Sequence, residues 1–142
     1  MQARVKWVED VAFLGESGSG HSVVMDGAAD AGGRNLGPRP MEMLLLGLGG
    51  CSAFDVVLIL KRGRQQVTDC EVFIDADRAA TDPKVFTEIR MRYVVTGHGL
   101  DARKVARAVN LSAEKYCSAS AIMNKTAHIT HTIEIVEEDA QS

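Results

Sequence analysis

Three cysteines are the residues of this chain best suited to chemistry. Cys51, Cys70 and Cys117 form an odd set without Cys-x-x-Cys spacing, which disfavours both a secreted disulfide framework and a structural zinc site. A thiolate is a nucleophile that peroxides oxidise first to a sulfenic acid, so an accessible cysteine can carry redox chemistry. Thiol chemistry and simple burial therefore remain as the two interpretations.

Cys51 lies in the apolar stretch LGLGGCSAFDVVLIL, residues 46–60. It shares a helix face with Leu48, and cysteine often packs as a small buried hydrophobe. Gly49 and Gly50 argue against simple packing, because each lowers the stability of a helix by about 1 kcal/mol relative to alanine. Without side chains at these positions, another backbone or a ligand can approach the Cys51 thiol closely.

The other two cysteines differ in their surroundings. Cys117 is flanked by small residues in EKYCSASAIMNK, on an expected second helix. Alone it is interpreted as core, but a pair of cysteines on two helices of one small domain suggests a shared role. Cys70 begins a regularly alternating strand, so we expect it to serve packing only.

The elements that must position these thiols follow from the hydrophobic pattern. Residues 1–39 indicate short antiparallel strands and a loop rich in glycine and proline. A helix is expected from Pro40 to about Lys61, within a central segment 40–63. It is apolar on nearly every side, which predicts a central helix that other structure surrounds.

The remaining segment, 69–136, predicts a strand hairpin, two helical pieces and a last strand. The hairpin strands alternate around 70–76 and 86–97, Asp101 is a plausible N-cap, and a second helical piece follows Ser112. The tail 137–142 is expected to fray. We therefore predict one α+β domain over residues 1–142, with a mostly antiparallel sheet and two central helical regions.

Composition excludes several function classes. The 142 residues include 16 basic and 19 acidic side chains, giving a net charge of -3, so no positive field favours nucleic acid as a partner. The N-terminus has no secretory-signal pattern, and Gly49, Gly50 and Asp55 interrupt the apolar run. We expect a cytoplasmic protein that binds no membrane.

Other candidate sites are weaker than the cysteines. His128 and His131 lie three residues apart in a strand and therefore on opposite faces, one expected at the surface and one packed, which makes them a poor metal pair. The stretch GESGSG, residues 15–20, has no following helix or Lys-Ser/Thr and indicates a hairpin turn. We expect neither a metal nor an organic cofactor.

The order of elements and two motifs resemble the OsmC/Ohr family of thiol-dependent peroxidases over almost the whole chain, most of all its YhfA-like branch. The motifs are PRPMEMLLLGLGGCSAFDVV, residues 38–57, and LSAEKYCSAS, residues 111–120. The first is similar to the family's helix running from a proline to the first cysteine, and the second to the segment around the second cysteine. The VTG at 95–97 also fits.

The resemblance implies a mechanism and an assembly. Cys51 would attack the peroxide and become a sulfenic acid, and Cys117 would condense with it to a disulfide that a thiol reductant reopens. The family also implies an intertwined homodimer with the cysteine site at the interface. The apolar surroundings favour organic hydroperoxides as substrates, in oxidative stress defence.

The sequence departs from the family in the groups that support the thiolate. The family's glutamate directly after the proline is replaced by Met41, and Glu42 follows one position late, a rotation of roughly 100°. Glu42 is expected mainly to favour the helix N-terminus. The hairpin FLGESGSGHSVV, residues 13–24, has no arginine, which leaves Arg39, or Arg34, as a substitute. Two alternatives therefore stay open: a non-enzymatic dimer that binds a small apolar or thiol-bearing ligand, and a purely structural dimer.

Overall fold

The N-terminal residues form a three-stranded antiparallel sheet, as the sequence predicts. The computed structural model describes residues 1–139. Its first strands are β1 (Ala3–Glu9), β2 (Ala12–Ser17) and β3 (Ser22–Met25), paired in the order β1-β2-β3. The connection from β1 to β2 is tight, with Asp10 at a positive φ of 48°, and Gly20 at φ 91° makes the next turn.

The loop after β3 is organised by one buried carboxylate. Asp26 accepts hydrogen bonds from the backbone N–H groups of Gly27 at 2.8 Å, Arg34 at 3.0 Å and Leu36 at 3.2 Å. Between them lies a single 3-10 turn, η1 (Ala29–Ala31). Because backbone donors satisfy the carboxylate, this loop follows one defined path despite its small residues.

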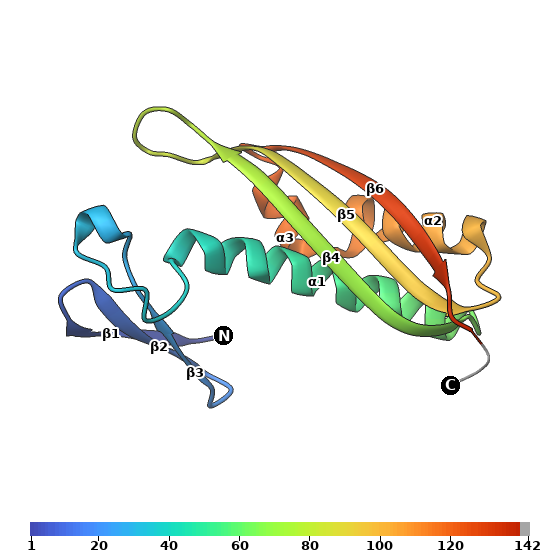
Figure 1. Cartoon of the computed structure of the whole chain (residues 1–142), viewed down its shortest axis with the longest axis horizontal. Helices are drawn as coiled ribbons and strands as arrows, with labels where there is room; N and C mark the ends of the chain where they lie inside the picture. Colours follow the sequence, from blue (N-terminus) through green and yellow to red (C-terminus); the bar gives the residue numbers. More distant parts are fainter. Residues whose placement is uncertain (140–142) are drawn as a thin grey trace. The chain divides into compact units, whose positions relative to one another are not determined.

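Helix α1 (Pro40–Arg62) is the longest helix and runs without a break through both glycines (Figure 1). Its buried residues are Leu48, Ser52, Val56 and Leu60, spaced by four and therefore on one stripe. The other apolar side chains of α1 are less buried than the sequence indicates for a surrounded helix. The chain leaves the helix at Gly63, and Arg64 takes a positive φ of 59°.

By length and composition alone, α1 could cross a membrane, with 22% of its most apolar window buried. Gly49, Gly50 and Asp55, which interrupt the apolar run in the sequence, do not break the helix, and its continuity agrees with the helix that the sequence predicts from Pro40. The core helix of a soluble protein can have the same length and apolar composition. The absence of a membrane partner and a cytoplasmic location stay predictions.

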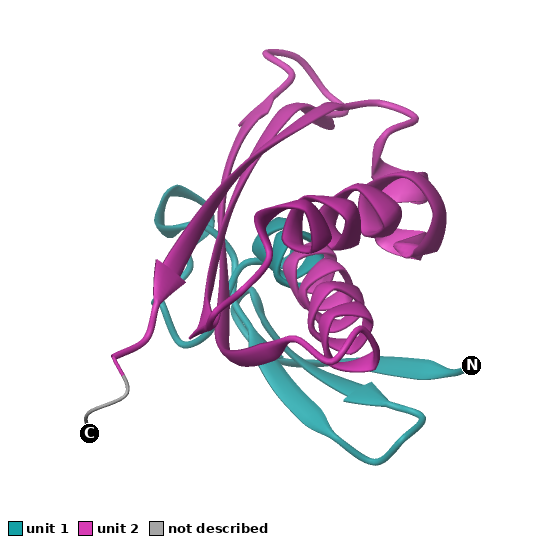
Figure 2. Cartoon of the chain, turned by 90° about the vertical axis from the view of Figure 1, so that its right-hand side faces the viewer, with its two compact units in different colours: residues 1–46 teal, residues 47–142 magenta. Residues whose placement is uncertain are grey.

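A second three-stranded sheet contains β4 (Gln66–Arg78), β5 (Phe86–His98) and β6 (His128–Glu137), in that order. Strands β4 and β5 form the expected antiparallel hairpin, whereas β6 pairs with β5 in parallel. A parallel neighbour requires a long crossover, which the helical segment between β5 and β6 supplies. Figure 2 shows that the helices of this part of the chain cover one face of the sheet.

The crossover consists of α2 (Ala102–Leu111), a π-helical turn η2 (Ser112–Tyr116) and the short helix α3 (Ser118–Met123). Asp101 is the N-cap of α2, as the sequence predicts, and its carboxylate accepts the N–H of Arg103 at 2.9 Å. The expectation that Cys117 lies within a helix is wrong. Cys117 is extended, with φ −76° and ψ 102°, and is the N-cap of α3.

The chain divides into two compact units, residues 1–46 and the residues from Gly47 onward (Figure 2). The α+β class is confirmed, and three of the four strand pairings described are antiparallel. The single domain over 1–142, with inner boundaries at 39, 63 and 69, stays a prediction. Of the tail expected to fray, residues 140–142 lie outside the described residues.

Candidate functional site

Cys51 and Cys117, far apart in the sequence, lie beside each other in the second unit. Both are free thiols, Cys51 half-buried on α1 and Cys117 buried with 3% of its surface exposed. The Cys51 thiol is close enough to the Cys117 thiol to raise the pKa of Cys117. The structure therefore brings together the two cysteines that the sequence singles out as a pair.

Burial chiefly sets the electrostatics of Cys117. It raises the pKa of the Cys117 thiol above its ordinary value, and the neighbouring Cys51 acts in the same direction. The backbone N–H of Ser120 donates to the Cys117 Sγ at 3.3 Å and opposes the shift. A thiol with a raised pKa is protonated at neutral pH, so Cys117 carries its proton beside Cys51.

The two glycines before Cys51 have different surroundings. A Cβ built on Gly49 would lie 3.0 Å from Cδ1 of Ile74 on β4, so the missing side chain lets helix and sheet approach closely. A Cβ on Gly50 would meet no described atom within 4 Å. Close packing therefore explains Gly49, and open access explains Gly50.

A buried chain of hydroxyl groups lies next to the thiol pair. The Ser52 hydroxyl is hydrogen-bonded to the Tyr93 hydroxyl and lies 3.3 Å from the Ser112 hydroxyl. Ser112 donates to Oδ2 of Asp55 at 2.9 Å. Burial raises the pKa of Tyr93, and the nearby charges of Cys117, Cys70 and Asp55 also raise it, while its hydrogen bond to Ser52 acts against the shift.

Sequence reasoning missed this hydroxyl chain, although it left one signal. On α1, Ser52 occupies a position of the stripe whose other members are Leu48, Val56 and Leu60. A polar side chain on an otherwise apolar, buried stripe needs a buried partner, since an unpaired buried hydroxyl is costly. Only the folded chain shows that the partners come from β5 and η2.

Glu42 and Arg39 lie at the start of α1, in the first unit. The backbone N–H of Arg39 donates to Oε1 of Glu42 at 2.8 Å, as in a capping box. Both side chains are exposed, and within residues 1–139 the Arg39 guanidinium takes part in no ion pair. Their support of the thiolate stays a prediction.

The comparisons with known proteins agree with this geometry. The family model described as OsmC-like protein matches residues 32–132. The chain belongs to the OsmC family. It is 54% identical over 136 residues to Protein YhfA of Escherichia coli strain K12, covering 96% of this chain and 98% of that protein. The family resemblance found in the sequence, including that to YhfA, is confirmed.

Solved structures share the fold. A hypothetical protein from Aquifex aeolicus VF5 superposes with a TM-score of 0.85 at 30% identity, covering 97% of each chain. The organic hydroperoxide resistance protein OhrB of Bacillus subtilis superposes with a TM-score of 0.62 at 21% identity, covering 94% of this chain and 98% of that one. The similarity to OhrB supports the fold alone.

The third cysteine of this OsmC-family chain is half-buried on β4. Burial raises the pKa of Cys70, and the charge of the adjacent Asp69 adds to the shift. Cys70 alternates with Val72 and Ile74 toward the partly buried side of the strand. Its expected role in packing alone stays a prediction.

The two histidines of β6 have different surroundings, as the alternation of a strand predicts. His128 is exposed, whereas His131 is half-buried. The His131 ring packs edge-on against Tyr93 with ring centroids 6.1 Å apart, and its Nε2 lies 3.2 Å from Oδ1 of Asn110. His131 therefore supports the ring of Tyr93 from the sheet.

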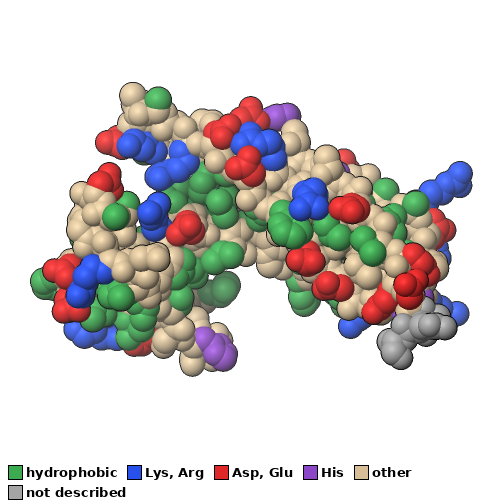
Figure 3. Space-filling view, viewed as in Figure 1, with side chains coloured by type: hydrophobic (Ala, Val, Ile, Leu, Met, Phe, Trp, Pro, Cys, Tyr) green, Lys and Arg blue, Asp and Glu red, His purple; other side chains and the backbone are tan. Residues whose placement is uncertain are grey.

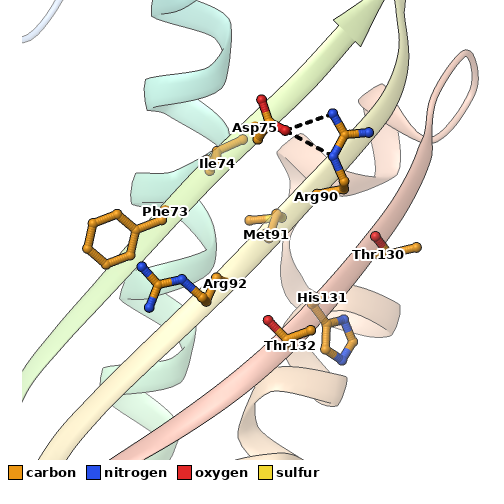
Figure 4. Close-up of a pocket in the computed structure, with 9 residues that line it drawn as sticks. All are labelled: Phe73, Ile74, Asp75, Arg90, Met91, Arg92, Thr130, His131 and Thr132. Carbon is orange, nitrogen blue, oxygen red and sulfur yellow. Dashed lines mark hydrogen bonds and ion pairs between the residues drawn. The ribbon is translucent and has the colours of Figure 1, made fainter.

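The sheet of strands β4, β5 and β6 in this OsmC-family protein carries a shallow hollow (Figure 4), and no cysteine lines it. Arg90 forms ion pairs with Asp75 at 2.8 Å and Asp77 at 3.0 Å, and Arg92 stacks 4.3 Å from the Phe73 ring centroid. Figure 3 shows charges of both signs with hydrophobic side chains between them along these strands. These contacts order an exposed surface.

Proposed function

We propose that this protein reduces organic hydroperoxides with Cys51 and Cys117. The Cys51 thiolate attacks the outer peroxide oxygen, the O–O bond breaks, and the alkoxide leaves as an alcohol after taking a proton. Cys51 is then a sulfenic acid. The Cys117 sulfur attacks it, which forms the disulfide and releases water made from the sulfenic hydroxyl and the Cys117 proton.

A thiol reductant completes the cycle. Two external thiols reduce the Cys51–Cys117 disulfide by successive thiol–disulfide exchange and become a disulfide themselves. Each turnover thus moves two electrons from the reductant to the hydroperoxide. No metal or organic cofactor is needed for these steps.

The observation that carries this proposal is the position of one buried thiol beside a more exposed one. The raised pKa of Cys117 keeps that thiol protonated at neutral pH, so it holds the proton that leaves with the water in the second step. Cys51 is half-buried and follows Gly50, whose side is open, so a hydroperoxide can reach its sulfur. Relatives of the same fold are described as organic hydroperoxide resistance proteins.

The family also supports two further parts of the proposal. We infer a homodimer, because apolar side chains such as Leu46 and Phe54 on α1 are exposed at 62% and 66% in the single chain. We also infer a cytoplasmic location, where thiol reductants keep cysteines reduced.

The test is oxidation of the purified protein by one equivalent of cumene hydroperoxide. Peptide mass spectrometry of the wild type should show a Cys51–Cys117 disulfide. Cys51→Ser should consume no hydroperoxide, and Cys117→Ser should react once and retain a trappable sulfenic acid on Cys51. Cys70→Ala, the matched control, should turn over like the wild type. Peroxide consumption by Cys51→Ser equal to that of the wild type would exclude this mechanism.

The non-enzymatic dimer remains the second candidate on a specific observation. Glu42 caps its own helix, and among the described groups that shift the pKa of Cys117 no cation occurs. Such a protein would bind an apolar or thiol-bearing ligand near Cys51 without consuming it. Cys51 that stays reduced under excess cumene hydroperoxide would favour this candidate over the peroxidase.

A further inference from the structure

Ser112 joins the two parts of the chain that carry the cysteines. It is fully buried, at the first residue of η2. Its hydroxyl donates to Asp55 at 2.9 Å and lies 3.3 Å from the Ser52 hydroxyl, both on α1. Its carbonyl oxygen accepts the backbone N–H of Cys117 at 2.8 Å.

The donors and acceptors of this network fit one continuous chain. The Ser112 hydroxyl donates to Oδ2 of Asp55. The Ser112 oxygen can then accept from Ser52, and the Ser52 oxygen can accept from Tyr93. The Tyr93 hydroxyl also lies 3.9 Å from Sδ of Met91, a weaker acceptor. Because the hydroxyls of Tyr93, Ser52 and Ser112 all have hydrogen-bond partners, this buried network resists rearrangement.

The network acts directly on the separation of the two thiols. Cys51 precedes Ser52 on α1, and Cys117 follows η2, whose first residue is Ser112. Moving η2 away from α1 would break the hydrogen bonds of Ser112 to Asp55 and Ser52, and breaking them costs free energy because Ser112 is buried. The side chain and the main chain of Ser112 thus hold α1 and the Cys117 backbone together.

We propose that Ser112 is a positioning residue for the thiol pair: by fastening the turn that ends at Cys117 to Ser52 and Asp55 on α1, it favours the Cys51–Cys117 disulfide over the two separate thiols. The use of this disulfide in peroxide reduction rests on the proposed function. The positioning itself does not, because any dithiol oxidant can form the same bond.

The experiment is a redox titration that contains no peroxide. Full-length protein is equilibrated in mixtures of oxidised and reduced dithiothreitol, quenched, alkylated and analysed by peptide mass spectrometry. In this exchange the two protein thiols lose two electrons and two protons, and oxidised dithiothreitol becomes the dithiol. The compared proteins are the wild type, Ser112→Ala, Asp55→Asn and Ser118→Ala.

The expected result is a shift confined to the network. Ser112→Ala should need a roughly tenfold more oxidising dithiothreitol ratio for half-formation of the disulfide, because it loses a hydrogen bond to a charged group. A tenfold change in this ratio corresponds to a change of about 30 mV in the reduction potential of the Cys51–Cys117 disulfide. Asp55→Asn should shift less in the same direction, because an amide oxygen can still accept from Ser112. Ser118→Ala, an exposed serine next to Cys117, should titrate like the wild type.

Two results overturn the proposal. One is a Ser112→Ala midpoint equal to that of the wild type, and the other is a Ser118→Ala shift as large as that of Ser112→Ala. If Ser112→Ala does not fold, as judged by circular dichroism, the Asp55→Asn midpoint decides the question, and an unchanged value rejects the proposal.

The titration also separates this proposal from the proposed function. If cumene hydroperoxide leaves Cys51 reduced while Ser112→Ala shows the tenfold shift, the peroxidase fails and the positioning role is supported. If hydroperoxide produces the disulfide while all four proteins share one midpoint, the peroxidase is supported and the positioning role fails.

Discussion

Each of the two compact units of this protein is stabilised internally by a different kind of interaction. Between Gly47 and Asp139, thirteen apolar side chains are buried, including those of Leu60 and Val109. Among the described residues of the first unit, Ala12 is the one apolar side chain that is buried, and all of β1 is exposed. The second unit therefore has a core of its own, and the first does not.

Polar groups have correspondingly different roles in the two units. In the first, the Asp26 carboxylate organises the loop through three backbone N–H groups. In the second, Asp55 ends a hydroxyl chain that lies among apolar side chains. The comparison teaches that hydrogen bonds can order a thin sheet and its loop, while stability against unfolding comes from the unit that removes apolar surface from water.

The largest expected effect is the loss of a core side chain. Leu60→Ala should lower the free energy of unfolding by about 2–5 kcal/mol, because it removes buried methyl groups and leaves a cavity. Lys61→Ala on the same helix is the matched control, because Lys61 is exposed, and it should change stability by less than about 0.5 kcal/mol. Urea unfolding measures both. Equal costs for the two variants would contradict the contrast between buried and exposed positions of α1.

The next largest effect concerns the exposed apolar side chains of the first unit. On β1 the side chains of Val5, Trp7 and Val8 are exposed at 61%, 63% and 57%. If a second copy covers them, Trp7→Glu should weaken the dimer at least about tenfold, because it buries a charge. Light scattering at micromolar concentration measures the mass. Lys6→Glu on the same strand is the control, and a wild type with the mass of one chain would contradict the dimer.

An acid titration should sharpen the comparison at low pH. The backbone N–H of Arg34, followed by that of Leu36, lowers the pKa of Asp26 below its ordinary value of 3.8. Its contribution to stability is therefore present above pH 3.8 and is lost as the pH falls through the lowered pKa. Asp26→Asn should remove this acid dependence and speed amide exchange at Arg34. Asp30→Asn, an exposed neighbour, should retain the wild-type titration; matching curves for Asp26→Asn and the wild type would argue against the role of Asp26.

The smallest effect lies at alkaline pH, in the second unit. Burial first, and then the neighbouring Cys51, raise the pKa of Cys117 above the ordinary value of 9.0. The stability that this thiol contributes is present below pH 9.0 and declines as the pH rises through the raised pKa. Cys117→Ala should flatten the loss of stability above pH 9.0 in urea unfolding, while Ser118→Ala should not. A wild-type slope in Cys117→Ala would contradict a pKa raised by burial.

Local patterns predicted much of the fold. The helix expected from Pro40 to Lys61 is observed as Pro40–Arg62, and Asp101 caps α2. These features depend on neighbours a few residues away, which the sequence displays directly. The parallel pairing of β6 with β5 was not predicted, because alternation indicates a strand without indicating which neighbour it joins or in which direction.

The same distinction applies to the site. The glycines before Cys51 and the matching segment around Cys117 were sufficient to select the two thiols and the family. They could not place Cys117 at the N-cap of α3, since that depends on the π-helical turn before it. The hydroxyl chain was not predicted either, because its partners are separated by 41 and 60 residues in sequence.

The sequence by itself predicted most of the strands and helices, the family and the two cysteines that lie beside each other, since propensity, periodicity and motif spacing are local properties of the chain. The tertiary structure alone decided that Cys117 is the buried member of the pair and that Ser112 joins its turn to α1. Burial and long-range hydrogen bonds arise only when distant segments pack together and exclude water from between them.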